Sequence, residues 1–223
     1  MSLIGMLPNI LAEAKRRYKS ALKNPAENFE AVDVMNAGEV SNIQGTVTQC
    51  DNAIFLASHI ADGSLAGRLN LIYCDPPFFT RGGFDAAIKR RSSDGEEYIF
   101  HVGAYDDYRA VGISDYLTDL AFRIMLMKDA LSDTGSIFIH LDRHAVHATK
   151  LLMDEIFGVE NFVNEIIWTY KSGGSTNKRF AHKHDTILFY SKTKMYKFNP
   201  TKEKSYNRML KKYAFSGVEE FKD

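Results

Sequence analysis

The sequence predicts an open, doubly wound α/β sheet with mixed strands, and two observations support this. Strand-like and helix-like patterns alternate from residue 46 to about residue 190, as in proteins whose helices cover a largely parallel sheet. Residues 69–74 (LNLIYC) and 136–141 (SIFIHL) are predominantly apolar, which is typical of strands buried on both faces. Ligands of such sheets bind outside the carboxyl ends of the strands, so a site is expected directly after such a segment.

The first part of the chain, residues 1–45, is expected to be a helix followed by a linker. Residues 8–23 have the pattern of a basic amphipathic helix, with Pro8 in its first turn. Residues 24–45 contain proline and glycine without a clear period, which indicates a linker. The main domain is therefore predicted to begin at residue 46.

The elements of this domain, residues 46–195, follow in order. Residues 46–50 (TVTQC) are predicted to be a short strand, and residues 52–62 a helix for which Asp51 is a suitable N-cap. Residues 80–113, rich in glycine, arginine and aspartate, form a long polar excursion; loops of that length are usually functional or mobile.

Two helices and two strands complete the predicted domain. The helices are 114–131 and 143–157, and the strands are 164–170 and 184–190, with the basic loop 171–183 between them. Ser114 is the candidate N-cap of the first helix, and Gly158 is expected to end the second. Residues 196–223 lack a clean period and are expected to begin a further region.

The bulk composition excludes several classes of protein. The net charge is zero, so a polyanion can be bound only through a local patch of basic residues. Two cysteines are too few for a disulfide scaffold and indicate a reducing compartment. No apolar run reaches the length of a membrane span, so a soluble cytoplasmic protein without a membrane partner is expected.

The most informative stretch is Asp75-Pro76-Pro77-Phe78, at the predicted carboxyl end of the strand 69–74. The aspartate offers acceptor oxygens, and prolines hold rigid carbonyl acceptors without backbone donors. The phenylalanine offers a face on which a planar ring can stack. Two acceptors beside a stacking face suit an exocyclic amino group on a heteroaromatic base, whereas the simpler interpretation is a rigid turn at a strand end.

This tetrapeptide resembles the [DNS]-P-P-[YFW] motif of amino methyltransferases, which methylate adenine N6 or cytosine N4. Together with residues 48–60, 116–168 and 178–193, it makes the chain similar to β-class DNA methyltransferases over about residues 46–195. Within that class the chain is most like the modification subunits of type III restriction systems. An acid in the first position is usual among the adenine-N6 enzymes, whereas cytosine-N4 enzymes more often carry serine.

The resemblance implies S-adenosyl-L-methionine as cofactor and double-stranded DNA as substrate. Asp75 and the backbone carbonyl of Pro76 are expected to accept hydrogen bonds from N6 of a flipped adenine, on which Phe78 stacks. Catalysis would then consist mainly of in-line positioning with water excluded. Asp51 corresponds to an acid near the adenine of the cofactor, although Cys50 stands where the family has glycine.

Several basic residues are candidates for contacts with DNA phosphates. Arg81, together with Arg90 and Arg91, belongs to the polar excursion. The loop 171–183 mixes basic and aromatic residues, and its candidates are Lys171, Lys178, Arg179, His182 and Lys183. Each of these side chains, taken alone, fits a solvated charge equally well.

His140, Asp142, His144 and His147 lie close together in the sequence and raise the question of a metal site. His140 and Asp142 lie at a predicted strand end, whereas the other two histidines share a helix turn. Asp142 is better placed as a helix N-cap, and the family uses no catalytic metal. No metal site is therefore expected.

The family's glycine-rich cofactor loop, F-x-G-x-G after a strand, is not found among the 15 glycines of this chain. In the β class this loop follows the catalytic motif, and its strand lies between those of TVTQC and LNLIYC. The chain is therefore expected to be the N-terminal catalytic portion of a larger enzyme, with a sheet that is incomplete at its C-terminal side. A missing C-terminal half, a second subunit or a homodimer is expected to complete it, and the chain alone is expected to be inactive.

Other functions stay open at this point. A cytosine-N4 enzyme, or an RNA or protein amino methyltransferase, can share the motif. A DNA-binding module without catalysis and a metal-dependent nuclease are further alternatives.

Overall fold

The computed structural model describes residues 2–25, 29, 45–80, 83–91, 97–106, 112–171 and 177–200. The helices are α1 (Leu3–Lys23), α2 (Asn52–Ala61), α3 (Ile113–Ala130) and α4 (Val146–Phe157), with a short 3-10 turn, η1 (Val159–Asn161). The strands are β1 (Leu69–Cys74), β2 (Gly83–Arg91), β3 (Glu97–Asp106), β4 (Leu131–Leu141), β5 (Phe162–Thr169) and β6 (His184–Ser191). Within these residues, no helix combines the length and the apolarity that crossing a membrane requires.

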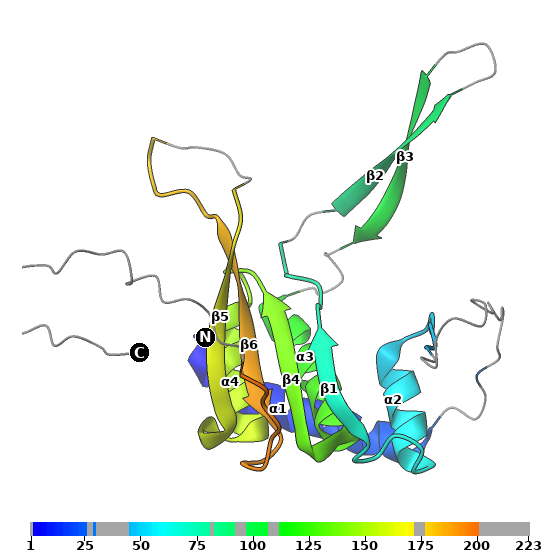
Figure 1. The fold of residues 1–223 in the computed structure, drawn as a ribbon, viewed down its shortest axis with the longest axis vertical. Coiled ribbons are helices and arrows are strands. Elements are labelled where there is room, and N and C mark those ends of the chain that lie inside the picture. Colours follow the sequence, from blue (N-terminus) through cyan, green and yellow to red (C-terminus); the bar gives the residue numbers. More distant parts are fainter. Residues whose placement is uncertain are drawn as a thin grey trace, which may run out of the picture.

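Four strands form the main sheet in the order β1-β4-β6-β5 (Figure 1). Strands β1 and β4 are parallel, whereas β6 pairs antiparallel with both β4 and β5. The predicted mixed α/β sheet is therefore confirmed. The register places Phe138 opposite both Tyr73 and Phe189, and the rings of the two phenylalanines stack with centroids 4.4 Å apart.

The helices α1, α3 and α4 lie behind this sheet in Figure 1. Side chains of a strand point alternately to its two faces, and β4 shows that alternation clearly. Ile137, Ile139 and Leu141 are completely buried under the helices, whereas Phe138 and His140, on the other face, are only half-buried. The core therefore lies between the sheet and the helices.

Two predictions about the edge of the sheet are wrong. Residues 46–50 were expected to be a strand, but they pair with no described strand, and Val47 is completely exposed. Strand β1 was expected to be buried on both faces, but Leu71 is 60% and Tyr73 is 56% exposed. Among the described strands, β1 pairs with β4 alone and forms the edge of the sheet, and Leu71 and Tyr73 lie on the face opposite the helices.

The predicted polar excursion 80–113 also needs correction. Strands β2 and β3 pair antiparallel within it and form a separate two-stranded hairpin that projects from the main sheet (Figure 1). Pairing satisfies the backbone hydrogen-bonding groups of a long polar segment, which explains why it is not an unstructured loop.

Three helix starts differ from prediction. Helix α1 begins at Leu3, with Ser2 as its cap, so that Pro8 lies within the helix. Helix α3 is preceded by Gly112 rather than capped by Ser114. The carboxylate of Asp142 accepts from the backbone N–H of His144, in the turn before α4, and so does not cap the helix itself. The predicted end of α4 is confirmed, because Gly158 adopts a φ of 95°, which favours glycine.

Candidate functional site

The tetrapeptide Asp75-Pro76-Pro77-Phe78 begins directly after β1, at the carboxyl end of the sheet. The side chain of Asp75 is 60% exposed, so its carboxylate is accessible to a ligand. The ring of Phe78 lies 5.6 Å from the ring of His140, which is on β4. The structure therefore places the acceptor and the aromatic ring of the motif at one end of the sheet.

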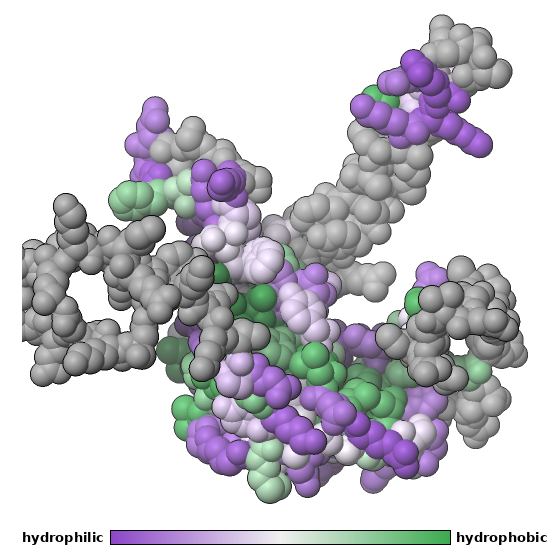
Figure 2. All heavy atoms as spheres, viewed as in Figure 1, coloured by the Kyte–Doolittle hydropathy of each residue, from purple (hydrophilic) through white to green (hydrophobic). Residues whose placement is uncertain are grey.

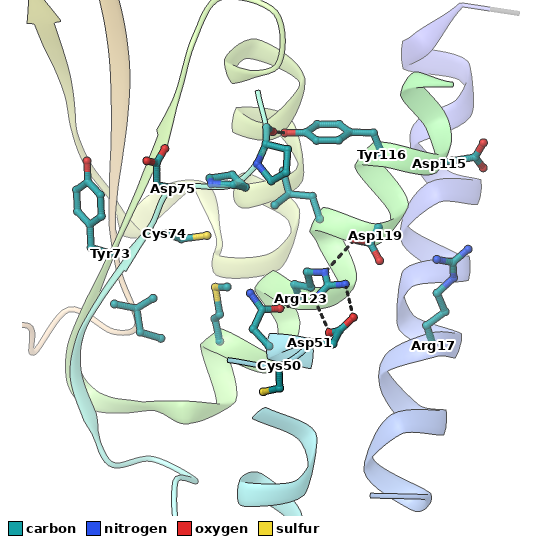
Figure 3. A pocket seen from close by; sticks show the side chains of 16 residues that line it. Arg17, Cys50, Asp51, Tyr73, Cys74, Asp75, Asp115, Tyr116, Asp119 and Arg123 are labelled. Atoms are coloured by element: carbon teal, nitrogen blue, oxygen red, sulfur yellow. Dashed lines mark hydrogen bonds and ion pairs between the residues drawn. The ribbon is translucent and has the colours of Figure 1, made fainter. Parts of the chain in front are cut away.

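Helix α3 holds the motif in place through Tyr116. The hydroxyl group of Tyr116 donates a hydrogen bond of 2.7 Å to the backbone carbonyl of Pro77 (Figure 3). Its ring also packs against Phe79, which is buried and adopts a φ of +61°. A non-glycine residue in this left-handed region costs about 1–3 kcal/mol and persists only where its surroundings hold it, as happens at many functional sites.

A cavity of about 740 Å³ opens between β1, the motif and helix α3. That volume falls within the range of small-molecule and cofactor sites. Its walls combine apolar residues such as Ile72 and Leu120 with the carboxylates of Asp51, Asp75 and Asp119 (Figure 3). Burial raises the pKa of the Cys74 thiol to about 11, so this part of the wall is uncharged.

Asp51 lies in this cavity and has two structural partners. Its carboxylate accepts a hydrogen bond of 2.8 Å from the backbone N–H of Ala53, so its predicted role as the N-cap of α2 is confirmed. It also accepts hydrogen bonds of 2.7 and 3.1 Å from Arg123, which binds Asp119 at 2.9 Å as well. The hydrogen bond from Arg123 holds the pKa of Asp51 below its usual value. The predicted contact with a cofactor stays a prediction.

Sequence reasoning missed Arg123. The only signal was its i,i+4 spacing from Asp119 within the predicted helix 114–131, and this spacing is common on exposed helix faces. Its contacts with Asp51 and Asn52 join segments 72 and 71 residues apart in the sequence, and these contacts fix the start of α2 against α3.

His140 is the second residue whose position the sequence did not reveal. Its Nδ1 atom lies 2.8 Å from the hydroxyl group of Tyr73 and 3.9 Å from the carboxylate of Asp75. Its Nε2 atom lies 3.5 Å from the carboxylate of Asp185 on β6. Three neighbouring strands thus bring two carboxylates to one imidazole beside the motif.

Basic residues project beyond the same end of the sheet. Figures 1 and 2 show the segment between β5 and β6 on one side and the β2–β3 hairpin on the other. The exposed candidates of the first segment are Lys171, Lys178, Arg179, His182 and Lys183. Arg143 and other nearby positive charges lower the pKa of His182, so the field here is positive. Lys89, Arg90 and Arg91 are exposed on the hairpin, whereas Arg81 lies outside the described residues.

The four residues that suggested a metal site do not come together. The carboxylate of Asp142 lies 2.6 Å from Nδ1 of His144, whereas His140 faces Asp75 and Asp185. In the described part of the chain, no group of three or more metal-binding side chains is present.

Comparison with known proteins identifies the family. Residues 69–221, more than half of the chain, match the N6/N4 DNA methylase family. The type II methyltransferase M.EcaI of Enterobacter cloacae is 36% identical over 165 residues, which cover 73% of this chain and 33% of that protein. The Mod subunit of the type III restriction-modification enzyme EcoP15I of Escherichia coli is 27% identical over 168 residues, covering 70% of this chain and 25% of that subunit.

Among solved structures, the M1.HpyAVI–SAM complex matches with a TM-score of 0.40 and 16% identity, over 68% of this chain and 60% of that chain. The chain spans about a third of the length of M.EcaI and about a quarter of the EcoP15I subunit. From the match over residues 69–221, the chain belongs to the N6/N4 family of DNA methylases.

Proposed function

We propose that this protein transfers a methyl group from S-adenosyl-L-methionine to N6 of adenine in double-stranded DNA, as the modification enzyme of a restriction-modification system in the cytoplasm. The observation that carries the proposal is the exposed carboxylate of Asp75, set beside rigid prolines and an aromatic ring at the mouth of a cavity. Its family includes enzymes acting on adenine N6 and on cytosine N4, and the acid at position 75 favours adenine.

The cavity has the chemistry that an adenosine-containing cofactor needs. Its apolar wall, formed by residues such as Ile72 and Leu120, suits the adenine ring, and Asp51 offers a carboxylate to hydroxyl or amino groups. When bound, the cofactor supplies an electrophilic methyl group. In this arrangement Asp51 and the apolar wall hold the cofactor, while Asp75 faces the target base.

The protein's own residues position the amino group for in-line attack. A flipped adenine stacks on Phe78, and its N6 donates hydrogen bonds to the carboxylate of Asp75 and the backbone carbonyl of Pro76. These acceptors orient the N6 lone pair toward the methyl group. Tyr116 keeps the loop in place through its hydrogen bond to Pro77.

The basic segments on either side of the site contact DNA phosphates in this proposal. Replacing Lys178 and Arg179 by glutamine should weaken DNA binding across sequences and flatten its salt dependence by roughly 0.9 units of slope per lost contact. The same changes at Lys15 and Lys19, which are exposed on α1, serve as the matched control. An unchanged salt dependence of DNA binding would show that the loop 171–183 does not contact DNA.

A further strand is proposed to pair with the open edge of β1. Among the described residues, no strand pairs with that edge, and the segment 45–50 has no partner strand. Unpaired strand edges invite pairing, and the segment that pairs here would also complete the cofactor site. It belongs either to another part of the gene product or to a second, different chain.

Methyl transfer with the complete gene product tests the proposed function. Tritiated S-adenosyl-L-methionine is incubated with DNA, RNA or protein, and the labelled DNA is digested to nucleosides. The proposal requires label in N6-methyladenine. Label in N4-methylcytosine moves the target to cytosine, label only in RNA or protein replaces the substrate class, and the absence of label contradicts the proposal.

A further inference from the structure

The proposed binding of the target adenine does not explain why His140 lies beside Asp75. Its side chain is only 17% exposed, although it carries a titratable ring. One ring nitrogen faces Tyr73 and Asp75 at the end of β1, and the other faces Asp185 on β6. The ring also contacts Phe78, the proposed stacking face for the base.

The hydrogen bonding of this imidazole is incomplete. Nδ1 has a partner in the hydroxyl group of Tyr73, but the buried Nε2 atom makes no hydrogen bond, even though Asp185 is 3.5 Å away. A buried polar atom without a partner costs about 1–3 kcal/mol, so a purely structural residue here would ordinarily be better satisfied.

The charged and titratable groups around His140 come from both neighbouring strands. Among the described residues, Tyr73 on β1 and Asp75 directly after β1 face the imidazole from one side, and Asp185 on β6 faces it from the other. The hydroxyl group of Tyr170 donates a hydrogen bond of 3.4 Å to the carboxylate of Asp185. Helices α3 and α4 pack on the opposite face of β4, which carries Ile139 and Leu141. The environment of the imidazole is therefore predominantly negative.

We propose that His140 acts through Asp75 as a positioning residue that takes up the proton released by methyl transfer. The inference rests on the proposed function. The N6 lone pair forms the new N–CH₃ bond while the S–CH₃ bond of the donor breaks and leaves its electron pair on sulfur. The positive charge passes to the nitrogen, which then loses one proton to the carboxylate of Asp75.

Asp75 must lose that proton before the next turnover, and a bound base covers it from solvent. His140 is the neighbouring base: Nδ1 exchanges the hydroxyl group of Tyr73 for the carboxyl group of Asp75, 3.9 Å away, and takes the proton. The resulting imidazolium lies between Asp75 and Asp185, whose charges stabilise it, and it then releases the proton to water. Pairing an imidazole with a carboxylate behind it is a frequent arrangement for moving protons in enzymes.

The test is the pH dependence of steady-state turnover, in which Asp75 must lose its proton in every cycle. Because the relay needs His140 to accept a proton, wild-type turnover should fall on acidification. His140→Gln should slow turnover about tenfold to a hundredfold, and its turnover should no longer decrease on acidification. The affinities for DNA and for the cofactor should change less than about threefold. His147→Gln, at an exposed histidine on α4, is the matched control and should behave like wild type.

Two results overturn the inference while the proposed function stands: a His140→Gln enzyme with the wild-type rate, or a slower one with the wild-type pH profile, which indicates a structural role. His140→Asn serves as a second variant if the glutamine variant unfolds at a lower temperature than wild type. A wild-type enzyme that labels no adenine overturns both the proposed function and this inference.

Discussion

On the helix-covered face of the sheet, Ile137, Ile139 and Leu141 of β4 have no exposed surface, and they pack against the residues of α3 and α4. At the carboxyl end of the same sheet, the carboxylate of Asp75 is 60% exposed and Nε2 of His140 has no hydrogen bond. Both regions include residues of β4, yet they differ in exposure and in hydrogen bonding.

The difference separates residues that maintain the fold from residues that are available to a ligand. The buried nitrogen without a partner and the positive φ of Phe79 each reduce stability. Proteins tolerate such local costs mainly where function requires them. The helix-covered face is formed mainly by fully buried apolar side chains, and it supplies the rigidity that holds the other region in place.

The largest expected effect is at Asp75. Asp75→Ala should lower the rate of methyl transfer by about a thousandfold, because the target amino group loses its charged acceptor. The melting temperature should not change, since the side chain is largely exposed. Asp133→Ala, which removes a 71% exposed carboxylate on the same sheet, is the control and should leave the rate unchanged. Near-wild-type turnover of the Asp75→Ala variant would contradict the assignment of Asp75 as the acceptor for the target amino group.

A change on the helix-covered face should show the reverse behaviour. Ile139→Ala should lower the free energy of unfolding by about 3 kcal/mol, because it leaves a cavity in a fully buried site. Leu71→Ala, on the exposed face of β1, should cost at most about 0.5 kcal/mol in this chain. Urea denaturation measures both values, and equal costs would show that the two faces do not differ as described.

Tyr116 connects the two regions, so its effect should be intermediate. Tyr116→Phe removes the hydrogen bond to the carbonyl of Pro77 while keeping the ring against Phe79. The expected loss is about 1 kcal/mol of stability, with a rate of methyl transfer lower by roughly tenfold because the loop is held less firmly. An unchanged rate with lowered stability would limit Tyr116 to a role in folding.

Arg123 should have the smallest effect, and the effect should depend on pH. Because Arg123 lowers the pKa of Asp51 in the folded protein, the pair stabilises the fold above the ordinary pKa of an aspartate, about 4. This stabilisation is lost as the pH falls through the lower, folded-state pKa. Arg123→Met should therefore cost about 1 kcal/mol at pH 7, after allowance for the partial exposure of Asp51, and much less near pH 3.

Thermal melts at both pH values measure this difference. Arg16→Met, which removes a 71% exposed partner of Glu13 on α1, is the control for the loss of an arginine. A cost for Arg123→Met that is the same at both pH values would show that the ion pair with Asp51 does not stabilise the fold.

Much of the fold could be predicted because periodic apolar patterns report burial against neighbouring elements. The strands at 136–141 and 184–190 and the helix at 52–62 were located in this way, and Gly158 correctly ended α4. The position of Asp75 followed as well, since the end of an apolar strand and an adjacent turn are both visible in the sequence.

The errors concern properties that depend on partners distant in sequence. Residues 46–50 have the composition of a strand, but a strand also needs a neighbour to pair with, and no described strand pairs with this segment. Similarly, Tyr73 and His140 are 67 residues apart, and only the pairing of β1 with β4 brings them together. No local pattern encodes such a contact.

The central claim is that the described residues form the half of a methylation site that holds the target base, and that a segment pairing with the edge of β1 completes the cofactor half. Calorimetric titration with S-adenosyl-L-methionine tests this claim most directly. The 223-residue chain alone should bind the cofactor more weakly than about 1 mM, whereas the chain together with the segment that pairs with β1 should bind it in the micromolar range. Tight cofactor binding by the 223-residue chain alone would contradict the claim.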